Sequence, residues 1–385
     1  MKIAFDAQLL FEKQKTGIGF TVENLLKNME LDKEDEFNLN YFSLRNGQDK
    51  ERVIKDYVNK GYKKSTCLFY YRLYRSICRK IPLPYSLFFR YKAQITQFFN
   101  YDIVPGTYGK SVTFIYDMVY KVYPETISKD TIKMLDYNLD KACKKSDHII
   151  TISKFSKSEI MKYMNVPENK ISVIPCGVDH SRFHPYYSED VVERARIKYG
   201  IPKNYILYLG TLEPRKNIEL LVEAYCNLIK ENDLCPDLVI AGKKGWMYET
   251  IFEKVHSLGI ENNIIFTDYI DTDDVPIILK GAIVFVYPSI YEGFGLPPLE
   301  AMACGTPVIA SNTASLPEVV GNAGILVDPF SVYEIKNAMH QMVFDDSKRE
   351  IMREKGILRA KEYTWRASAD QLKNVYKKIL GVMVR

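Results

Sequence analysis

Short apolar runs rich in β-branched residues recur along the chain, and a segment with apolar residues at helical spacing follows many of them. The early runs are KIAF, VTFIY and HIITI, and the later runs are YILYLGT, DLVIAG, NIIFT, AIVFVYP, TPVIAS and GILV. Such runs are typical of buried strands, and strands that alternate with helices form parallel sheets covered by helices on both faces. The pattern therefore predicts an α/β fold built on parallel sheets.

The length of the chain predicts two domains. One hydrophobic core seldom serves a chain of 385 residues. The segment VIPCGVDHSRFHP combines two prolines and a glycine in a polar context, which is typical of a linker. We therefore expect an N-terminal domain over residues 1–178 and a C-terminal domain over residues 179–365. The apolar spacing in residues 366–385 predicts a closing helix, because no strand pattern follows it.

Composition and cysteine usage predict a soluble cytoplasmic protein. Hydrophobic residues make up 46% of the chain and charged residues 26%, as in ordinary globular enzymes. Asp6 interrupts the first apolar run, and no run reaches the roughly 18 apolar residues that a membrane span needs. The 7 cysteines are scattered without a CxxC pair, which favours free thiols in a reducing compartment.

Positive charge is concentrated in residues 57–101, which we call the basic aromatic segment. It contains no acidic residue, although the net charge of the whole chain is only +5. Tyrosines and phenylalanines alternate with its lysines and arginines, a combination that suits anionic lipid headgroups. Three interpretations stay open: a helix whose rings pack inward while its cations are solvated, peripheral contact with an anionic membrane surface, and nucleic-acid binding. The last is the least favoured, because no recognised nucleic-acid motif accompanies the segment.

A pair of cations stands in the turn after the run YILYLG. Arg215 and Lys216 lie in TLEPRKN, directly before a helical pattern for which Asn217 is the expected N-cap. In open α/β sheets, ligands bind in the turns beyond the carboxyl ends of strands. A helix N-terminus offers free N–H groups and partial positive charge, so two cations beside it would bind a diphosphate. The alternative is a pair of solvated loop cations.

The turn SIYEGFGL follows the run AIVFVYP and precedes two prolines that suit the start of a helix. Gly293 and Gly295 allow the backbone to come close to a ligand. The N–H groups of Phe294, Gly295 and Leu296 would then face an anion or a sugar hydroxyl.

Two glutamates bracket this turn. Glu292 stands before the expected helix start and Glu300 in the first turn of that helix. Helix geometry therefore does not place the two carboxylates as a facing pair, and their roles must differ.

The segment KTGIGFT forms a third candidate turn, between the first strand and the helical pattern VENLLKNM. Gly17 and Gly19 would bring backbone amides up to a phosphate there, and a plain turn is the alternative. We expect no metal site. The aspartates of DTDD at residues 271–274 suit helix capping, and the pair His180 and His184, with Cys176 nearby, lies in the expected linker.

Taken together, these motifs resemble those of glycosyltransferase family 4. YEGFGLPPLEAMACGTPVIAS is similar to the signature of that family of retaining enzymes, and TGIG, VIPCGVD, GTLEPRKN and AGKKGW match the family in order. The resemblance implies the GT-B fold, in which two Rossmann-like parallel-sheet domains face each other across a cleft and the C-terminal helix packs back towards the N-terminal domain. Within the family, the chain is most similar to mannosyltransferase-type enzymes that build bacterial surface polysaccharides.

The resemblance also implies roles for single residues on the donor side. Arg215 and Lys216 would bind the diphosphate of the donor, and Glu300 would hydrogen-bond the ribose hydroxyls. Stabilising a leaving diphosphate with two cations and a helix N-terminus is electrostatic catalysis, which needs neither a metal nor a cofactor.

The transferred sugar would lie at the glycine turn. By resemblance, Glu292 would hold it together with the backbone of residues 293–296, so Glu292, Arg215 and Lys216 are the expected catalytic residues. Gly17 and Gly19 would approach the donor from the other domain. Retention implies either attack on the face from which the leaving group departs or a double displacement, and the sequence names no nucleophile.

Two departures from the family pattern concern the N-terminal domain. The family often has a His-Asp pair after a strand, where the histidine contacts the donor sugar. The matching stretch here is FIYDMV, so Tyr116 replaces the histidine and Asp117 remains. Both would contact sugar or acceptor, with Tyr116 as a hydrogen-bond donor. The residue after TGIG is commonly arginine, and here it is Phe20.

We expect a metal-independent hexosyltransferase that works in cell-surface polysaccharide synthesis. Its donor would be a nucleoside-diphosphate sugar, with GDP-mannose favoured and a UDP-sugar as the alternative, and its acceptor a glycan or a lipid-linked glycan. The basic aromatic segment would place it on the inner face of the cell membrane, with no nucleic-acid partner. The alternatives are a nucleotide-sugar hydrolase or epimerase of the same fold, and a non-catalytic sugar-nucleotide-binding partner.

Overall fold

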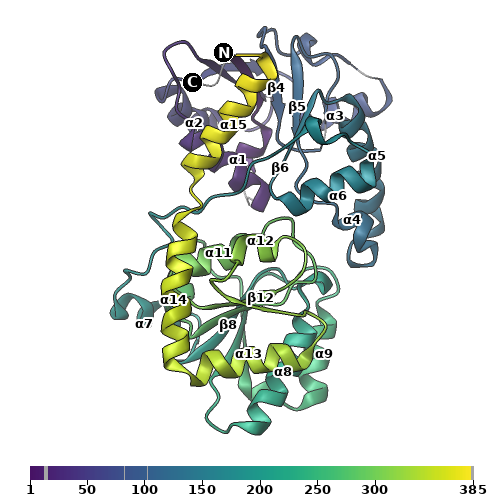
Figure 1. Cartoon of the computed structure of the whole chain (residues 1–385). Coiled ribbons are helices and arrows are strands. Elements are labelled where there is room, and N and C mark those ends of the chain that lie inside the picture. Colours follow the sequence, from purple (N-terminus) through teal and green to yellow (C-terminus); the bar gives the residue numbers. More distant parts are fainter. Residues whose placement is uncertain (13–15, 82, 102, 383–385) are drawn as a thin grey trace.

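The computed structural model describes residues 1–12, 16–81, 83–101 and 103–382. Pro82 and the side chains of Arg79 and Lys80, which belong to the basic aromatic segment, lie outside the described residues. Two sheets with helices packed against them form two domains, one above the other in Figure 1. The strand pairs within both sheets are parallel. The prediction of an α/β fold of parallel sheets is therefore confirmed.

Over the described residues, the first sheet has seven strands and the second has six. The strands of the first sheet, in spatial order, are β3 (Lys63–Cys67), β2 (Glu36–Phe42), β1 (Lys2–Asp6), β4 (Ile95–Phe98), β5 (Lys110–Phe114), β6 (His148–Thr151) and β7 (Ile171–Val173). The strands of the second sheet are β10 (Ile264–Asp268), β9 (Asp237–Ala241), β8 (Tyr205–Leu209), β11 (Val284–Tyr287), β12 (Val308–Ser311) and β13 (Ile325–Val327).

Helices connect the strands within each domain. Those of the first domain are α1 (Gly17–Asn28), α2 (Gly47–Asn59), α3 (Tyr71–Lys80), α4 (Val119–Val122), α5 (Lys129–Lys145) and α6 (Lys154–Met164). Those of the second are α7 (Glu189–Lys198), α8 (Ile218–Glu231), α9 (Glu249–Leu258), α10 (Val275–Gly281), α11 (Leu296–Ala303), α12 (Leu316–Val320), α13 (Val332–Phe344) and α14 (Asp346–Lys361). The last helix among the described residues is α15 (Trp365–Leu380).

The central strands are buried on both faces. Along β8, the consecutive residues Ile206, Leu207 and Tyr208 are all fully buried. Because successive side chains of a strand point to opposite faces, both faces of the second sheet must be covered by helices. This explains why such strands read as unbroken apolar runs in the sequence.

The chain passes between the domains at a tight crossing. Val178 forms an isolated parallel bridge with Thr364. A Cβ on Gly177 would lie 2.2 Å from the backbone N of Trp365, so only glycine fits at this contact. Beyond the crossing, α15 packs on α1 of the first domain, as Figure 1 shows in yellow and purple. The Tyr376 hydroxyl donates a hydrogen bond of 2.9 Å to Gln97 Oε1 of β4. The expected return of the C-terminal helix is thus confirmed.

The rings of the basic aromatic segment pack inward. Tyr74, Tyr85 and Phe89 are buried around Phe42 of β2, with ring centroids 4.8 Å apart for Phe42 and Tyr74. The exposed cations of the segment include Arg72, Arg90 and Lys92. Inward packing of the rings, the first of the three interpretations, is confirmed, and contact with an anionic membrane surface stays a prediction.

Candidate active site

Two cations and one carboxylate meet at the carboxyl edge of the second sheet. Arg215 and Lys216 lie in a short 3-10 helix, Pro214–Lys216, between β8 and α8, and Glu292 follows β11. Strands β8 and β11 are neighbours, so the turns that follow them meet although they are far apart in sequence. The sequence predicted both turns separately, and the fold brings them together.

Both carboxylate oxygens of Glu292 are engaged by these cations. Lys216 Nζ lies 2.5 Å from Glu292 Oε1, and Arg215 Nη1 lies 3.1 Å from Glu292 Oε2. The Tyr287 hydroxyl donates to Glu292 Oε1 at 3.0 Å and accepts from Lys216 Nζ at 2.6 Å. The other terminal nitrogen of Arg215 forms an ion pair with Glu213, whose Oε1 lies 2.7 Å from Arg215 Nη2. The result is a fixed buried cluster rather than a set of solvated loop charges.

The charges in this cluster determine its protonation. Burial acts to raise the pKa of Glu292, but Lys216 and Arg215 outweigh burial and lower the pKa to about 2. Burial and the charge of Arg215 lower the pKa of Lys216, against the attraction of Glu292. Glu292 is therefore an ionised carboxylate whose basicity is reduced by its partners.

The glycine turn leads directly into α11. Gly295 is its N-cap residue with φ +116, a conformation that L side chains rarely adopt. In the part of the chain that the structure describes, the N–H groups of Phe294, Gly295 and Leu296 have no hydrogen-bond acceptor. They form the start of an eight-residue helix and can bind an oxygen anion. The helix begins at Leu296 rather than at either proline.

The first domain closes on this turn. Ser153 Oγ and Ser156 Oγ, at the N-terminus of α6, donate to the carbonyl oxygen of Gly293 at 2.7 and 3.1 Å. The Met118 N–H donates to the Tyr291 hydroxyl at 3.0 Å. A Cβ on Gly293 would lie 2.7 Å from the Tyr116 carbonyl oxygen. Glycine is therefore required for the two domains to meet at this point.

A glutamate of the second domain caps a helix of the first. The carboxylate of Glu318, in α12, accepts from the Lys154 N–H at 2.9 and 3.1 Å and from the Phe155 N–H at 3.4 Å. An acceptor at a helix N-terminus satisfies unpaired N–H groups and interacts with the partial positive charge there. This contact stabilises the closed arrangement of the two domains.

Asp117 faces the cluster, whereas the side chain of Tyr116 does not. Burial raises the pKa of Asp117, while the nearby charge of Arg215 lowers it. The Tyr116 hydroxyl donates to the Phe99 carbonyl at 3.0 Å inside the first domain, and its ring stacks on Phe114 at 5.5 Å. The expectation that Tyr116 donates a hydrogen bond to sugar or acceptor is corrected, because this hydroxyl is already bonded in the core. Only its backbone carbonyl lies at the domain contact.

The two N-terminal glycines lie inside α1 rather than in a turn before it. The helix begins at Gly17, with Thr16 as its N-cap. Thr16 Oγ1 accepts a hydrogen bond from the Gly19 N–H at 3.4 Å, so that N–H is not free for a phosphate. A Cβ on Gly17 would meet no atom within 4 Å, so open space lies beside it.

Glu300 lies apart from Glu292, on α11. It is the fifth residue of that helix and not in its first turn as expected. Burial raises the pKa of Glu300 to about 7, against the charge of Arg182. Among the described residues, none donates a hydrogen bond to its carboxylate. A carboxylate held in this way can accept hydrogen bonds from a ligand.

Asn217 occupies the N-cap position of α8, but its side chain makes no capping hydrogen bond. Its backbone is left-handed, with φ 59, and its amide donates instead to the carbonyls of Pro288 at 3.2 Å and Pro329 at 2.6 Å. Asn217 thus ties together the loops that follow β11 and β13, and it holds the turn that carries the preceding cation pair.

The structure adds residues that the sequence did not single out, namely Tyr287, Ser153, Ser156 and Glu318. Tyr287 is the last residue of β11, so its place at the carboxyl end of a strand was a usable signal. Ser153 likewise follows β6. Nothing in the sequence pairs Glu318 with α6, because that contact joins residues 164 positions apart.

The prediction that the DTDD aspartates cap a helix is wrong, because their side chains make no capping hydrogen bond. Asp274 is the N-cap residue of α10 but makes no capping hydrogen bond, and Lys198 Nζ donates to its Oδ2 at 2.6 Å and to Asp271 Oδ2 at 2.8 Å.

Within the described residues, no group of three or more histidine, cysteine, aspartate or glutamate side chains could hold a metal ion. Of the helices described, none is long and apolar enough to cross a membrane.

Comparison with known protein families gives two matches that divide the chain. Glycosyl transferases group 1 matches residues 191–359, and Glycosyltransferase Family 4 matches residues 66–182. O-antigen chain mannosyltransferase B of Escherichia coli is 37% identical over 276 residues, which cover 71% of this chain and 72% of that protein. The serotype-specific mannosyltransferase WbdA of Escherichia coli is 32% identical over 58% of this chain, but over only 28% of its own length.

Solved structures show the same fold at low sequence identity. HepE from Anabaena, solved in complex with UDP and glucose, has a TM-score of 0.73 at 18% identity, covering 98% of this chain and 100% of that chain. WaaG, a glycosyltransferase involved in lipopolysaccharide biosynthesis, has a TM-score of 0.69 at 15% identity, covering 97% and 99%. The chain therefore belongs to glycosyltransferase family 4, has the GT-B fold, and is a glycosyltransferase related to bacterial mannosyltransferases of O-antigen assembly.

Proposed function

We propose that this chain is a metal-independent, retaining glycosyltransferase that moves a hexose from a nucleoside-diphosphate sugar to a glycan or lipid-linked acceptor. The cluster of Arg215, Lys216 and Glu292 carries this proposal. Mannose is the favoured sugar and GDP-mannose the favoured donor, since two similar proteins are mannosyltransferases. A UDP-sugar is the alternative. The process is the synthesis of a cell-surface polysaccharide.

The two cations would stabilise the leaving diphosphate. Arg215 and Lys216 are already fixed by Glu292, Tyr287 and Glu213, so they need little reorganisation when negative charge develops nearby. The unpaired N–H groups at the start of α11 add donors for the same oxygens. This electrostatic set supplies what a metal ion would otherwise provide, which is why we propose metal independence.

Glu292 acts in this mechanism as a positioning and sugar-binding residue. Both of its oxygens form ion pairs with cations, and its pKa is lowered to about 2, so it is a weak nucleophile and a weak base. Double displacement through Glu292 is therefore disfavoured. We propose attack by the acceptor on the face from which the diphosphate departs, which retains the anomeric configuration.

Glu300 would bind the ribose of the donor. Its carboxylate has no hydrogen-bond donor among the described residues, and the two ribose hydroxyls would supply donors. Gly17 would border the donor from the first domain, where space for a ligand is open. Asp117, which faces the cluster from the same domain, would contact the sugar or the acceptor hydroxyl.

The protein would work at the inner face of the cell membrane. The exposed cations of the basic aromatic segment support this, since each lysine or arginine near an anionic surface contributes about 1 kcal/mol. Binding of the whole protein to anionic and to neutral vesicles tests this part. Equal binding to both kinds of vesicle would contradict it.

Nucleotide binding tests the donor site. Thermal unfolding of the protein with UDP, GDP or ADP should show stabilisation by one of them, by about 2.7 kcal/mol at 100 times its dissociation constant. Arg215→Gln should abolish this stabilisation, whereas Arg194→Gln, which removes an exposed cation of α7, should not. Stabilisation by none of the three nucleotides, or equal stabilisation of the Arg215→Gln variant, would overturn the proposal.

A further inference from the structure

A pocket of about 550 Å³ opens at the carboxyl edge of the first sheet, beside the N-terminus of α3. We call it the α3 pocket. Its charged lining comes from three elements: Glu12 follows β1, Arg45 and Lys50 follow β2, and Arg72 and Arg75 belong to α3. The cluster of Arg215 and Glu292 does not line it.

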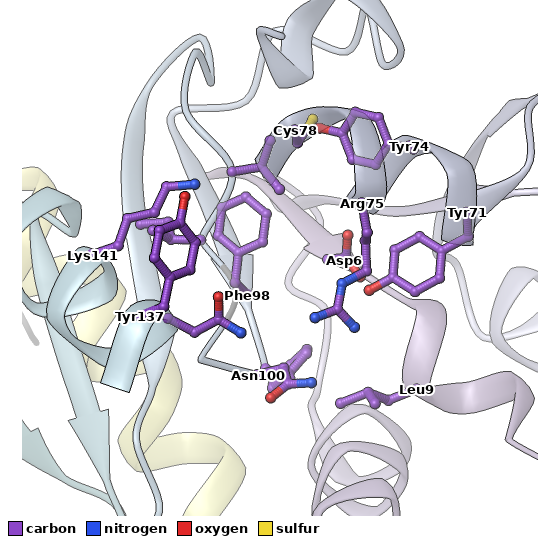
Figure 2. Close-up of a pocket in the computed structure, with 14 residues that line it drawn as sticks. Asp6, Leu9, Tyr71, Tyr74, Arg75, Cys78, Phe98, Asn100, Tyr137 and Lys141 are labelled. Atoms are coloured by element: carbon purple, nitrogen blue, oxygen red, sulfur yellow. The ribbon is translucent and has the colours of Figure 1, made fainter. Parts of the chain in front are cut away.

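A narrower hollow of about 50 Å³ adjoins the α3 pocket and shares Arg75 with it. Figure 2 shows the Arg75 guanidinium reaching from α3 into the space between Asp6 and Asn100, with the ring of Tyr71 beside it. Burial raises the pKa of Asp6 to about 6, against a hydrogen bond from the Gln8 N–H and the charge of Arg75. Asp6 thus balances Arg75 at the inner end.

The remaining charges of the α3 pocket are mainly positive. Among the described residues, Arg45, Lys50 and Arg72 form no ion pair with a carboxylate. Arg45 donates to the Tyr70 hydroxyl at 3.1 Å, and Lys50 donates to a backbone carbonyl at 2.6 Å. Of the described residues that line the α3 pocket, Glu12 alone carries a carboxyl group, and burial raises the pKa of that group. Three cations without acidic partners therefore surround a space large enough for a ligand, and an anion would satisfy them.

The α3 pocket lies on the same sheet edge as Asp117. Strands β2, β1, β4 and β5 are consecutive neighbours, so the ends of β2 and β5 are three strand spacings apart. With about 4.8 Å between neighbouring strands, the ends of β2 and β5 lie roughly 14 Å apart; Arg45 follows β2 and Asp117 follows β5. One elongated ligand can therefore reach both places from within the first domain.

Exposed leucines flank the α3 pocket. Leu68 is 77% exposed and directly precedes Phe69 and Tyr70, which line the pocket. Leu73 is 48% exposed and follows Arg72 on α3. Apolar side chains next to unpaired cations suit a ligand that has an anionic group followed by a hydrocarbon chain.

We propose that the α3 pocket binds the phosphate of a lipid-linked acceptor, with Arg45, Lys50 and Arg72 holding the phosphate oxygens. Leu68 and Leu73 meet the first part of the hydrocarbon chain. The sugar end of the acceptor extends along the sheet edge to Asp117, where its hydroxyl receives the transferred sugar. This inference rests on the proposed function for the reaction itself, and it adds the chemical class of the acceptor and the residues that select it.

Binding of a simple amphiphile tests the inference without knowledge of the sugar. The probes are decyl diphosphate, inorganic pyrophosphate and neutral decyl glucoside, each titrated into the full chain with saturating UDP and GDP present to occupy the donor diphosphate site. Wild-type protein should bind decyl diphosphate most tightly. Pyrophosphate should bind more weakly, because it lacks the chain, and decyl glucoside should bind weakly, because it lacks the charge.

Substitutions locate the site. Arg45→Gln and Arg72→Gln should each weaken decyl diphosphate binding by about tenfold, since each removes charge-assisted hydrogen bonds. The matched control is Arg194→Gln, which removes an exposed arginine of α7 that does not line the α3 pocket. Leu73→Asn should weaken decyl diphosphate binding but not pyrophosphate binding. Equal binding of all three probes, or an effect of Arg194→Gln as large as that of Arg72→Gln, would overturn the inference.

Steady-state transfer separates this inference from the proposed function. With a lipid diphosphate-linked sugar as acceptor, Arg72→Gln should raise the acceptor KM by about tenfold and leave kcat and the donor KM unchanged. The same variant should match the wild type with a phosphate-free glycan acceptor. If the wild type transfers sugar equally well to both acceptors, only the present inference fails. If it transfers sugar from no nucleotide sugar, the proposed function fails, and the binding pattern of the variants still decides the nature of the α3 pocket.

Discussion

Gly293 offers a direct test of domain closure. In the closed arrangement described here, a Cβ on Gly293 would lie 2.7 Å from the Tyr116 carbonyl oxygen and 3.0 Å from the Asp117 Cβ. The backbone atoms of Tyr116 are fixed by a hydrogen bond from Ser156 Oγ to that carbonyl, at 3.0 Å. Gly293→Ala therefore introduces a clash across the domain contact, while the φ of Gly293 is not in the left-handed region.

The clash should act on closure and not on folding. Overpacking typically costs about 1–3 kcal/mol, and here the domains can separate to avoid it. If turnover requires closure, the population of the closed state and kcat should fall by about 5- to 160-fold. The unfolding temperature should change little, because each domain keeps its own core.

The assay compares kcat and thermal unfolding for Gly293→Ala and for Gly47→Ala. Gly47 begins α2, and a Cβ there would meet no atom within 4 Å, so this control should keep wild-type kcat. Wild-type turnover by Gly293→Ala would refute the reasoning that closure onto this turn is needed. A large fall in unfolding temperature would also refute it, because the added Cβ would then destabilise the folded protein as a whole and not only its closed arrangement.

Three further predictions concern single groups. Tyr116→Phe removes the hydrogen bond to the Phe99 carbonyl and should lower stability by about 1 kcal/mol in urea unfolding, with kcat unchanged; a large kcat loss would restore a role in sugar contact. Glu318→Ala removes the cross-domain cap of α6 and should disfavour closure by about 1 kcal/mol, seen as a roughly fivefold lower kcat. The pKa of Glu300 is raised to about 7 from its usual 4.5, so the folded state favours the protonated form. Its contribution to stability is complete below about pH 4.5 and is lost as the pH rises through about 7; unfolding of the wild type should show this loss relative to Glu300→Gln, and parallel pH profiles would contradict it.

Local sequence patterns predicted the strands, the turns that carry the site and the last helix, whereas the return of that helix to the first domain was implied by the family resemblance. The apolar run of β8 and the prolines near the start of α11 are signals that a few neighbouring residues contain in full. Arg215, Lys216 and Glu292 could each be assigned to a turn at a strand end. Their mutual pairing could not, because it depends on β8 and β11 being neighbours in the sheet.

Side-chain direction and contacts between domains lay beyond the sequence. Tyr116 occupies a position that the family pattern marks, yet packing on Phe114 and a bond to Phe99 turn its hydroxyl into the core. Similarly, Gly17 was expected in a turn before the helix, whereas α1 begins at Gly17 because Thr16 serves as its N-cap. The cap of α6 by Glu318 exists only when the two domains are closed.

Transfer of labelled sugar tests the central claim most directly. Membranes that contain the natural acceptors are incubated with the protein and with labelled GDP-mannose, UDP-glucose or another nucleotide sugar, and label in the lipid-linked glycan fraction is counted. The wild type should transfer label from one donor, with GDP-mannose favoured. Glu292→Gln removes the carboxylate that Lys216 and Arg215 share and should abolish transfer, whereas Arg194→Gln should not. Release of free sugar without labelled glycan, or undiminished transfer by Glu292→Gln, would contradict the account.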